Sequence, residues 1–115
     1  MPATYDITIY NGATFNQQFI WRDSAGALVN LTGFTARMQI RANKAAPTFI
    51  HELTNLNGGI ALGDAAGTIN LTIPAATTAG FTAKKGVYDL ELVSGSGVVT
   101  RLVEGAVVFS PEVTR

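Results

Sequence analysis

Apolar and polar residues alternate with a period of two along most of the chain. In the segment 34–41, apolar residues at the even positions oppose Arg37, Gln39 and Arg41 at the odd positions. The segments 5–10, 15–21, 68–73 and 86–93 show the same alternation. Because successive side chains of a strand point to opposite faces, this pattern is typical of half-buried β-strands.

Turn-forming residues separate these segments, for example at 57–59, 63–64 and 95–97. We expect about eight short strands, within a range of seven to nine, spaced as in all-β folds. The segment 74–81 is the only helix candidate, and it is too short for the crossover of a parallel α/β sheet. The pattern therefore predicts an antiparallel β-sandwich, with a small barrel as the second choice, formed as one domain over residues 1–115.

Composition narrows the classes of function. Charged residues make up 14% of the chain, and the eight basic residues balance the eight acidic ones. Nucleic-acid binding needs clustered basic residues, so we expect no nucleic-acid partner, whereas zero net charge favours assembly with like copies. There is no cysteine. We find no signal peptide and no apolar run long enough to span a membrane, so we expect synthesis in the cytoplasm and no membrane partner.

The charges near the C-terminus raise the question of catalysis. Asp89 and Glu91 share one strand face, opposite to apolar neighbours, and Arg101 is expected across a hairpin from them. Acid–base chemistry needs a desolvated carboxylate, and the alternation makes this face the wetter one. His51 is the only histidine and has no partner at metal-ligand spacing. We therefore predict no enzyme activity, no catalytic or metal-binding residue and no cofactor.

Several stretches together carry a family resemblance. They are "YDITIYNGATF" (5–15), "WRDSAGALVNLTGFTARMQIR" (21–41), "GGIALGDAAGTINLTIPAATTA" (58–79) and the closing 86–115 with "SPEVT" near its end. In combination they resemble small structural proteins of tailed bacteriophages and are similar to the N-terminal domains of phage baseplate upper proteins. The resemblance implies an immunoglobulin-like β-sandwich that is part of the virion and has no catalytic role.

The resulting hypothesis is a non-enzymatic component of a tailed-phage virion, at the tail, baseplate or fibre attachment, with other virion proteins as partners. One alternative is a capsid decoration or cement protein that bridges capsomers. Another is a carbohydrate-binding module that contacts host glycans through the region of Trp21 and Tyr10, since β-sandwiches carry many functions.

We also expect a homo-oligomer whose contacts use outer strand faces. The basic group on 37–41 and the acidic group on 89–91 are expected on separate faces, which suits a head-to-tail ring. Apolar residues on otherwise polar faces would supply most of the binding energy. The interface candidates are Arg37, Gln39, Arg41, Asp89, Glu91, Ile20, Ile50 and Val93.

Overall fold

The computed structural model describes residues 3–113 and contains nine strands, one short helix and one 3₁₀ turn. Residues 1–2 and 114–115, which belong to the predicted domain and include Thr114 of the terminal motif, lie outside the described residues. The elements are β1 (Ala3–Thr4), β2 (Ile7–Tyr10), β3 (Phe15–Ile20), β4 (Thr35–Arg41), β5 (His51–Thr54), β6 (Ile60–Leu62), η1 (Asp64–Ala66), β7 (Thr68–Ile73), α1 (Ala75–Thr78), β8 (Lys85–Val93) and β9 (Val99–Ser110).

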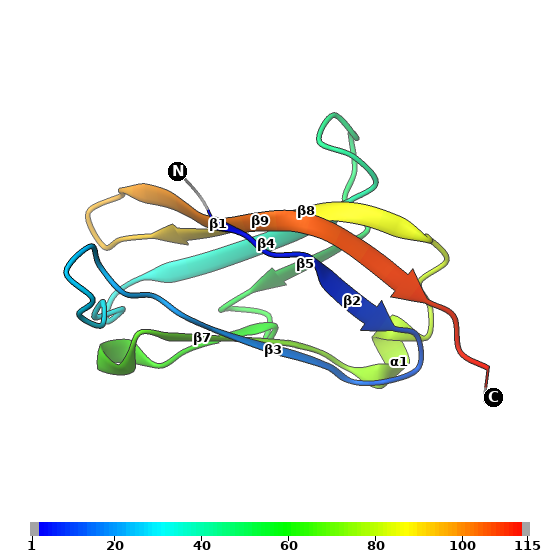
Figure 1. Ribbon diagram of the computed structural model, residues 1–115, viewed down its shortest axis with the longest axis horizontal. Helices are drawn as coiled ribbons and strands as arrows, with labels where there is room; N and C mark the ends of the chain where they lie inside the picture. The colour runs from blue at the N-terminus through cyan, green and yellow to red at the C-terminus, as the bar shows by residue number, and fades with distance from the viewer. Residues whose placement is uncertain (1–2, 114–115) are drawn as a thin grey trace.

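The strands form two sheets that face each other (Figure 1). One sheet has the order β1-β9-β8-β4-β5, with β2 also paired to β9, and the other has the order β3-β7-β6. The order β9-β8-β4-β5 corresponds to strands G, F, C and C′ of an immunoglobulin sandwich, and β3-β7-β6 corresponds to strands B, E and D. The first strand of the chain, split into β1 and β2, pairs with β9, the counterpart of strand G. The predicted all-β sandwich is confirmed.

The core lies between the sheets and follows the alternation seen in the sequence. Met38 on β4 lies opposite Leu90 on β8, and neither side chain is exposed. Ile69 and Leu71 close the core from the other sheet. Because the alternation is a local property of each strand, the inward faces of β3, β4, β7 and β8 were predicted correctly.

The N-terminal strands depart from a purely antiparallel arrangement. Both β1 and β2 pair in parallel with β9, through registers that start at Ala3↔Val103 and Ile7↔Val107. Between them the chain passes close to Gly105 of β9, where an added Cβ would overlap the Tyr5 carbonyl group. A glycine that interrupts an alternating strand, as Gly105 does, indicates a bulge or a close backbone approach, and the structure shows the close approach.

The bulge lies three residues earlier. Leu90 pairs with Val103 but Glu91 pairs with Arg101, so Leu102 is the extra residue in β9. One extra residue in a strand interrupts the alternation, so residues beyond the bulge point to the opposite face of the sheet from the one expected. Arg101 and Glu104, which are three apart in sequence, consequently both point to the outer face of the sheet.

The helix α1 connects the two sheets at one end of the sandwich, as predicted for the segment 74–81 (Figure 1). Pro74 directly precedes its first residue. The buried Thr78 hydroxyl donates to the Ala13 carbonyl at 2.8 Å, and the Asn11 side chain donates to the Thr78 carbonyl at 2.8 Å. These bonds fix the turn between β2 and β3 against the helix.

Candidate functional site

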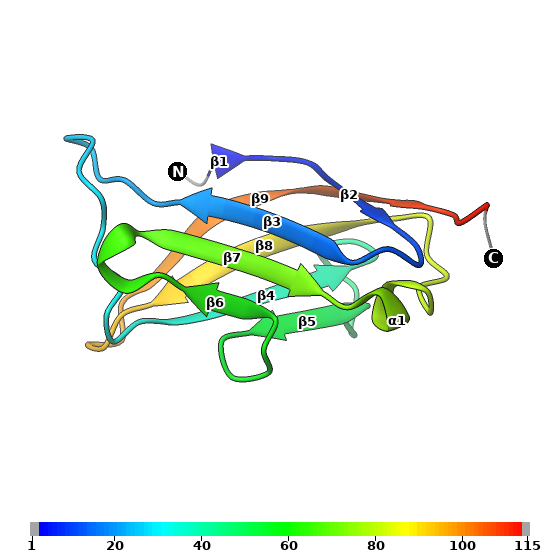
Figure 2. The same cartoon turned by 90° about the horizontal axis from the view of Figure 1, so that it is seen from below.

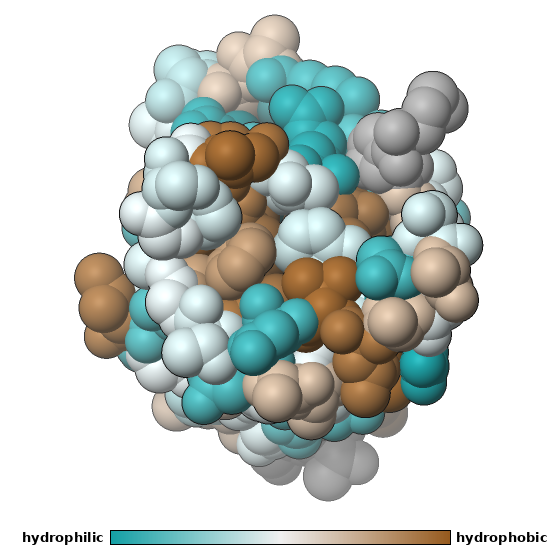
Figure 3. Space-filling model, turned by 90° about the vertical axis from the view of Figure 1, so that its left-hand side faces the viewer, coloured by the Kyte–Doolittle hydropathy of each residue, from teal (hydrophilic) through white to brown (hydrophobic). Residues whose placement is uncertain are grey.

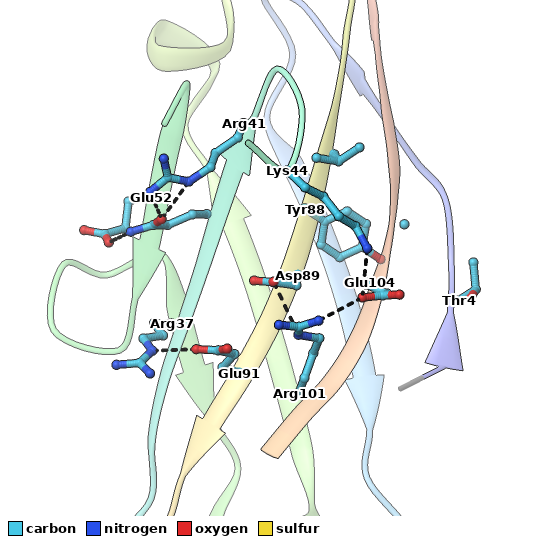
Figure 4. A pocket seen from close by; sticks show the side chains of 13 residues that line it. Thr4, Arg37, Arg41, Lys44, Glu52, Tyr88, Asp89, Glu91, Arg101 and Glu104 are labelled. Atoms are coloured by element: carbon cyan, nitrogen blue, oxygen red, sulfur yellow. Dashed lines mark hydrogen bonds and ion pairs between the residues drawn. The ribbon is translucent and has the colours of Figure 1, made fainter. Parts of the chain in front are cut away.

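A hollow lies on the outer face of the larger sheet (Figure 4). It has a volume of about 650 Å³ and is lined by residues of β1, β4, β5, β8 and β9 and of the loop that follows β4. We call this surface the charged face, because it gathers four basic and four acidic residues, half of the charged residues in the chain. These residues are Arg37, Arg41, Lys44, Arg101, Glu52, Asp89, Glu91 and Glu104.

Strand pairing brings these side chains together. β4 lies between β5 and β8, so Arg37 is opposite Glu91, and Gln39 has Asp89 on one side and Glu52 on the other. All of them alternate with buried apolar residues and therefore point away from the core.

The expectation that the basic and acidic groups lie on separate faces is wrong. They lie on the same face, since β4 and β8 are antiparallel neighbours whose odd-numbered residues point the same way. The Arg37 Nε atom is 2.8 Å from Glu91 Oε1, within one chain. The head-to-tail ring, which needed each group to be free for a neighbouring copy, loses its geometric basis.

Arg101 lies between two carboxylates, Asp89 and Glu104, on the charged face. Its Nε atom is 3.5 Å from Asp89 Oδ2, and its Nη1 atom is 3.5 Å from Glu104 Oε1 (Figure 4). Lys44 approaches Glu104 to 3.9 Å from the loop after β4. The predicted cross-strand contact of Arg101 with one of the two acidic residues is confirmed at Asp89, and the bulge at Leu102 adds Glu104 to it.

Asp89 is the carboxylate whose titration this arrangement alters. Burial raises its pKa first, and the negative charges of Glu91 and Glu104 add to the rise, while Arg101 and Lys44 oppose it. Asp89 also lies directly opposite Glu104, a like-charge pair that destabilises a sheet. The cations of the charged face therefore compensate for carboxylate repulsion only in part.

Gln39 and Arg41 extend the network toward β5. The Gln39 Nε2 atom donates to Glu52 Oε2 at 2.7 Å, and Arg41 donates to Gln39 Oε1 at 2.7 Å and to the Ala46 carbonyl at 2.7 Å. No buried side-chain nitrogen or oxygen in residues 3–113 lacks a hydrogen-bond partner. The charged face is thus held in one arrangement by its own bonds, which suits recognition of a fixed partner surface.

His51 lies apart from the charged face. Its ring packs against Phe81 at a centroid distance of 5.6 Å, toward the core side of β5, whereas the neighbouring Glu52 points outward. Burial lowers the His51 pKa, and the charge of Glu52 raises it in part. No group of three or more His, Cys, Asp or Glu that could hold a metal ion occurs within residues 3–113.

The three apolar interface candidates are dispersed. Ile20 is 51% exposed at the end of β3 in the other sheet. Ile50 is half-buried and packs against the core, so it is not an outward-facing residue. Val93 is half-buried at the end of β8, where it lies between Thr35 and Val99. The structure does not combine these three residues into one apolar surface.

The region proposed for glycan binding is also divided. Tyr10 ends β2 and Trp21 follows β3, so the length of β3, about 20 Å, separates them. Tyr10 is exposed, but Trp21 is half-buried and packs edge-on against Phe34 at 5.9 Å. The two rings cannot form one stacking platform.

Exposed apolar side chains occur at the end of the sandwich that holds the turn between β8 and β9. Leu28, Val98 and Val99 belong to the segments at this end. Figure 3 shows apolar and polar atoms intermixed over it. This end therefore has the character of an ordinary mixed protein surface.

Sequence reasoning missed Lys44 and Glu52 as members of the charged face, and it did not place Glu104 there. Glu52 alternates with Leu53 and was recognisable as outward-facing, but its neighbours depended on the pairing of β5 with β4. Lys44 lies in a loop, where alternation gives no information. No family model matches the chain, and no curated protein matches it. The described residues form no helix that is long and apolar enough to cross a membrane.

Proposed function

We propose that the chain is a non-enzymatic structural component of a tailed-phage virion, located at the tail, baseplate or fibre attachment. The observation that carries this proposal is the charged face, a preformed network of ion pairs and hydrogen bonds with no net charge. Such a surface docks a complementary protein and fixes its orientation more than its affinity. The partners are other virion proteins.

The family resemblance supports the same proposal, although its residues mainly build the fold. In the 23–41 stretch, the Asp23 side chain accepts hydrogen bonds from the backbone of Ala25 and Ala27, and Gly26 and Gly33 adopt positive φ. These residues shape the turns before β4. The same stretch ends in Arg37, Gln39 and Arg41, which belong to the charged face.

Mass spectrometry of purified virions from a phage that encodes this chain tests the proposal. We expect the polypeptide in the particles at six to a few dozen copies, a range typical of tail structures. Several hundred copies would place it on the capsid as a decoration protein, and its absence from particles would refute a virion role.

Charge reversal tests the role of the charged face. Arg37→Glu should reduce incorporation into particles, because it opposes Glu91 and disrupts the network. Arg22→Glu is a matched control, since Arg22 lies outside the charged face in the segment after β3. Equal incorporation of the two variants, with both folded, would show that partners do not use this face.

A further inference from the structure

The strand β3 is an unprotected edge of the smaller sheet. Among residues 3–113 its one partner in that sheet is β7, because β1 and β2 both pair with β9 in the other sheet. It is six residues long and contains no proline and no charged residue. Proteins usually blunt edge strands with short length, charges, proline or a cover, because an open edge accepts a further strand.

The backbone groups that face outward from β3 can be assigned from its neighbours. The Trp21 amide donates to the Gly67 carbonyl, which directly precedes β7, at 2.9 Å. The Thr72 amide on β7 donates to the Gly59 carbonyl, which directly precedes β6, and so points away from β3. Backbone direction alternates along a strand, so Phe15, Gln17 and Phe19 bond to β7. The amides and carbonyls of Asn16, Gln18 and Ile20 therefore face the open edge.

A hollow of about 320 Å³ lies beside this edge, between β2 and β3. Ile7 and Thr8 line it from β2, and Phe15, Asn16 and Gln17 line it from β3. Figure 2 shows β2 running alongside β3 without pairing with it. An incoming strand would direct alternate side chains into this hollow.

The sequence of β3 is self-complementary. Residues 15–19 read Phe-Asn-Gln-Gln-Phe, so the order of aromatic and amide side chains is the same in both directions. In an antiparallel pair centred on Gln17, Phe15 lies opposite Phe19 of the other copy, and Asn16 lies opposite Gln18. Aromatic pairs and amide pairs both stabilise cross-strand contacts. This register also places the outward backbone groups of Asn16 and Gln18 against each other, as an antiparallel ladder requires.

We infer that β3 pairs antiparallel with β3 of a second copy of this chain, across a two-fold axis at Gln17. The two smaller sheets then form one continuous sheet across the two copies. The contact is isologous and closes as a dimer. This dimer is a property of the chain itself and holds whether or not the chain belongs to a virion.

Cysteine crosslinking of the full chain tests the register, and the chain has no cysteine of its own. Gln17→Cys should form a disulfide-linked dimer, because directly opposed residues have Cα atoms within the 4.4–6.8 Å range of disulfides. Ala61→Cys is the matched control, exposed on β6 at the other edge of the same sheet. At equal micromolar concentration, we expect Gln17→Cys to crosslink about tenfold faster or more.

Two further measurements make the test independent of any single variant. A mixture of Asn16→Cys and Gln18→Cys should give the mixed dimer in preference to either homodimer. Gln17→Lys should abolish the concentration-dependent dimer seen by light scattering, because it opposes two like charges, whereas Ala61→Lys should not. Thermal unfolding confirms that each variant is folded.

Three results would overturn the inference. The first is equal crosslinking of Gln17→Cys and Ala61→Cys. The second is wild-type protein that remains monomeric at about 1 mM, since the dissociation constant would then exceed the millimolar range. The third is crosslinking at residue 17 to a different polypeptide in place of a second copy.

Discussion

Gly105→Ala is expected to detach the N-terminal segment from β9. The Tyr5–Asp6 peptide lies against β9 at this glycine, and an added Cβ would lie 2.7 Å from the Tyr5 carbonyl carbon and 3.0 Å from Asp6 Oδ1. The first distance is shorter than real Cβ contacts allow, and the second is tighter than nearly all of them. Since hydrogen bonds to β8 and β9 hold both neighbours, neither can move away without breaking a bond.

Three hydrogen bonds set the magnitude. The Tyr5 amide donates to the Glu104 carbonyl at 2.9 Å, the Ala106 amide donates to Asp6 Oδ1 at 2.9 Å, and the Tyr88 hydroxyl donates to the Tyr5 carbonyl at 2.5 Å. At about 1 kcal/mol each, their loss would lower the free energy of unfolding by ~3 kcal/mol. Relaxation of the freed segment reduces this cost, and the buried Tyr88 hydroxyl left without a partner increases it.

Urea unfolding measures the effect, with Gly95→Ala as the matched control. A Cβ at Gly95 would lie 3.6 Å from the Gly33 carbonyl oxygen, an ordinary contact, so this control should stay within about 0.5 kcal/mol of wild type or be slightly stabilised. Tyr88→Phe should cost about 1 kcal/mol, and its combination with Gly105→Ala should be less than additive because both act on the Tyr5 carbonyl. A Gly105→Ala protein as stable as the control would refute the steric argument.

Three other perturbations follow from the same structure. Burial raises the Tyr88 pKa, so the folded protein favours the neutral hydroxyl. Above pH 10.0, the value for unfolded tyrosine, the free energy of unfolding of the wild type should therefore fall by about 1.4 kcal/mol per pH unit. Urea titrations of Tyr88→Phe should lack this slope. The Asp89 pKa is also raised, so its ionised form opposes folding at neutral pH. Asp89→Asn should raise the melting temperature by about 1–2 °C at pH 7 and leave it unchanged below pH 3.8. A lower melting temperature of the variant at pH 7 would contradict this. A double-mutant cycle on Arg37 and Glu91 should give a coupling of only about 0.2–1 kcal/mol, falling in high salt, because Arg37 is 54% exposed.

The inward-facing residues were predictable from the sequence because alternation is local. Leu90 and Leu92 on β8, and Met38 and Ile40 on β4, are buried as expected. Local alternation does not reveal where a strand begins, however. Phe49 is four residues before Leu53, so alternation alone places both on one face, but β5 begins only at His51, and Phe49 is 47% exposed.

The charged face was predicted only in its parts, because its assembly depends on strand pairing. Arg37 and Glu91 are 54 residues apart, and only the antiparallel register of β4 and β8 makes them neighbours. Pairing between distant strands is decided by the whole core and by loop lengths, which no single segment encodes. The bulge at Leu102 is a further non-local feature, since uninterrupted alternation would have placed Arg101 and Glu104 on opposite faces.

The placement of the N-terminal strand connects the two surfaces of the molecule. Residues 3–10 extend the larger sheet along the free edge of β9, and Gly105 gives room for the close approach of Tyr5 and Asp6. That choice completes the charged face along its β9 side, where Thr4 lines the hollow. It also leaves β3 without a partner on its outer edge. The face and the edge belong to different sheets, so a copy bound at β3 would leave the charged face open to another protein.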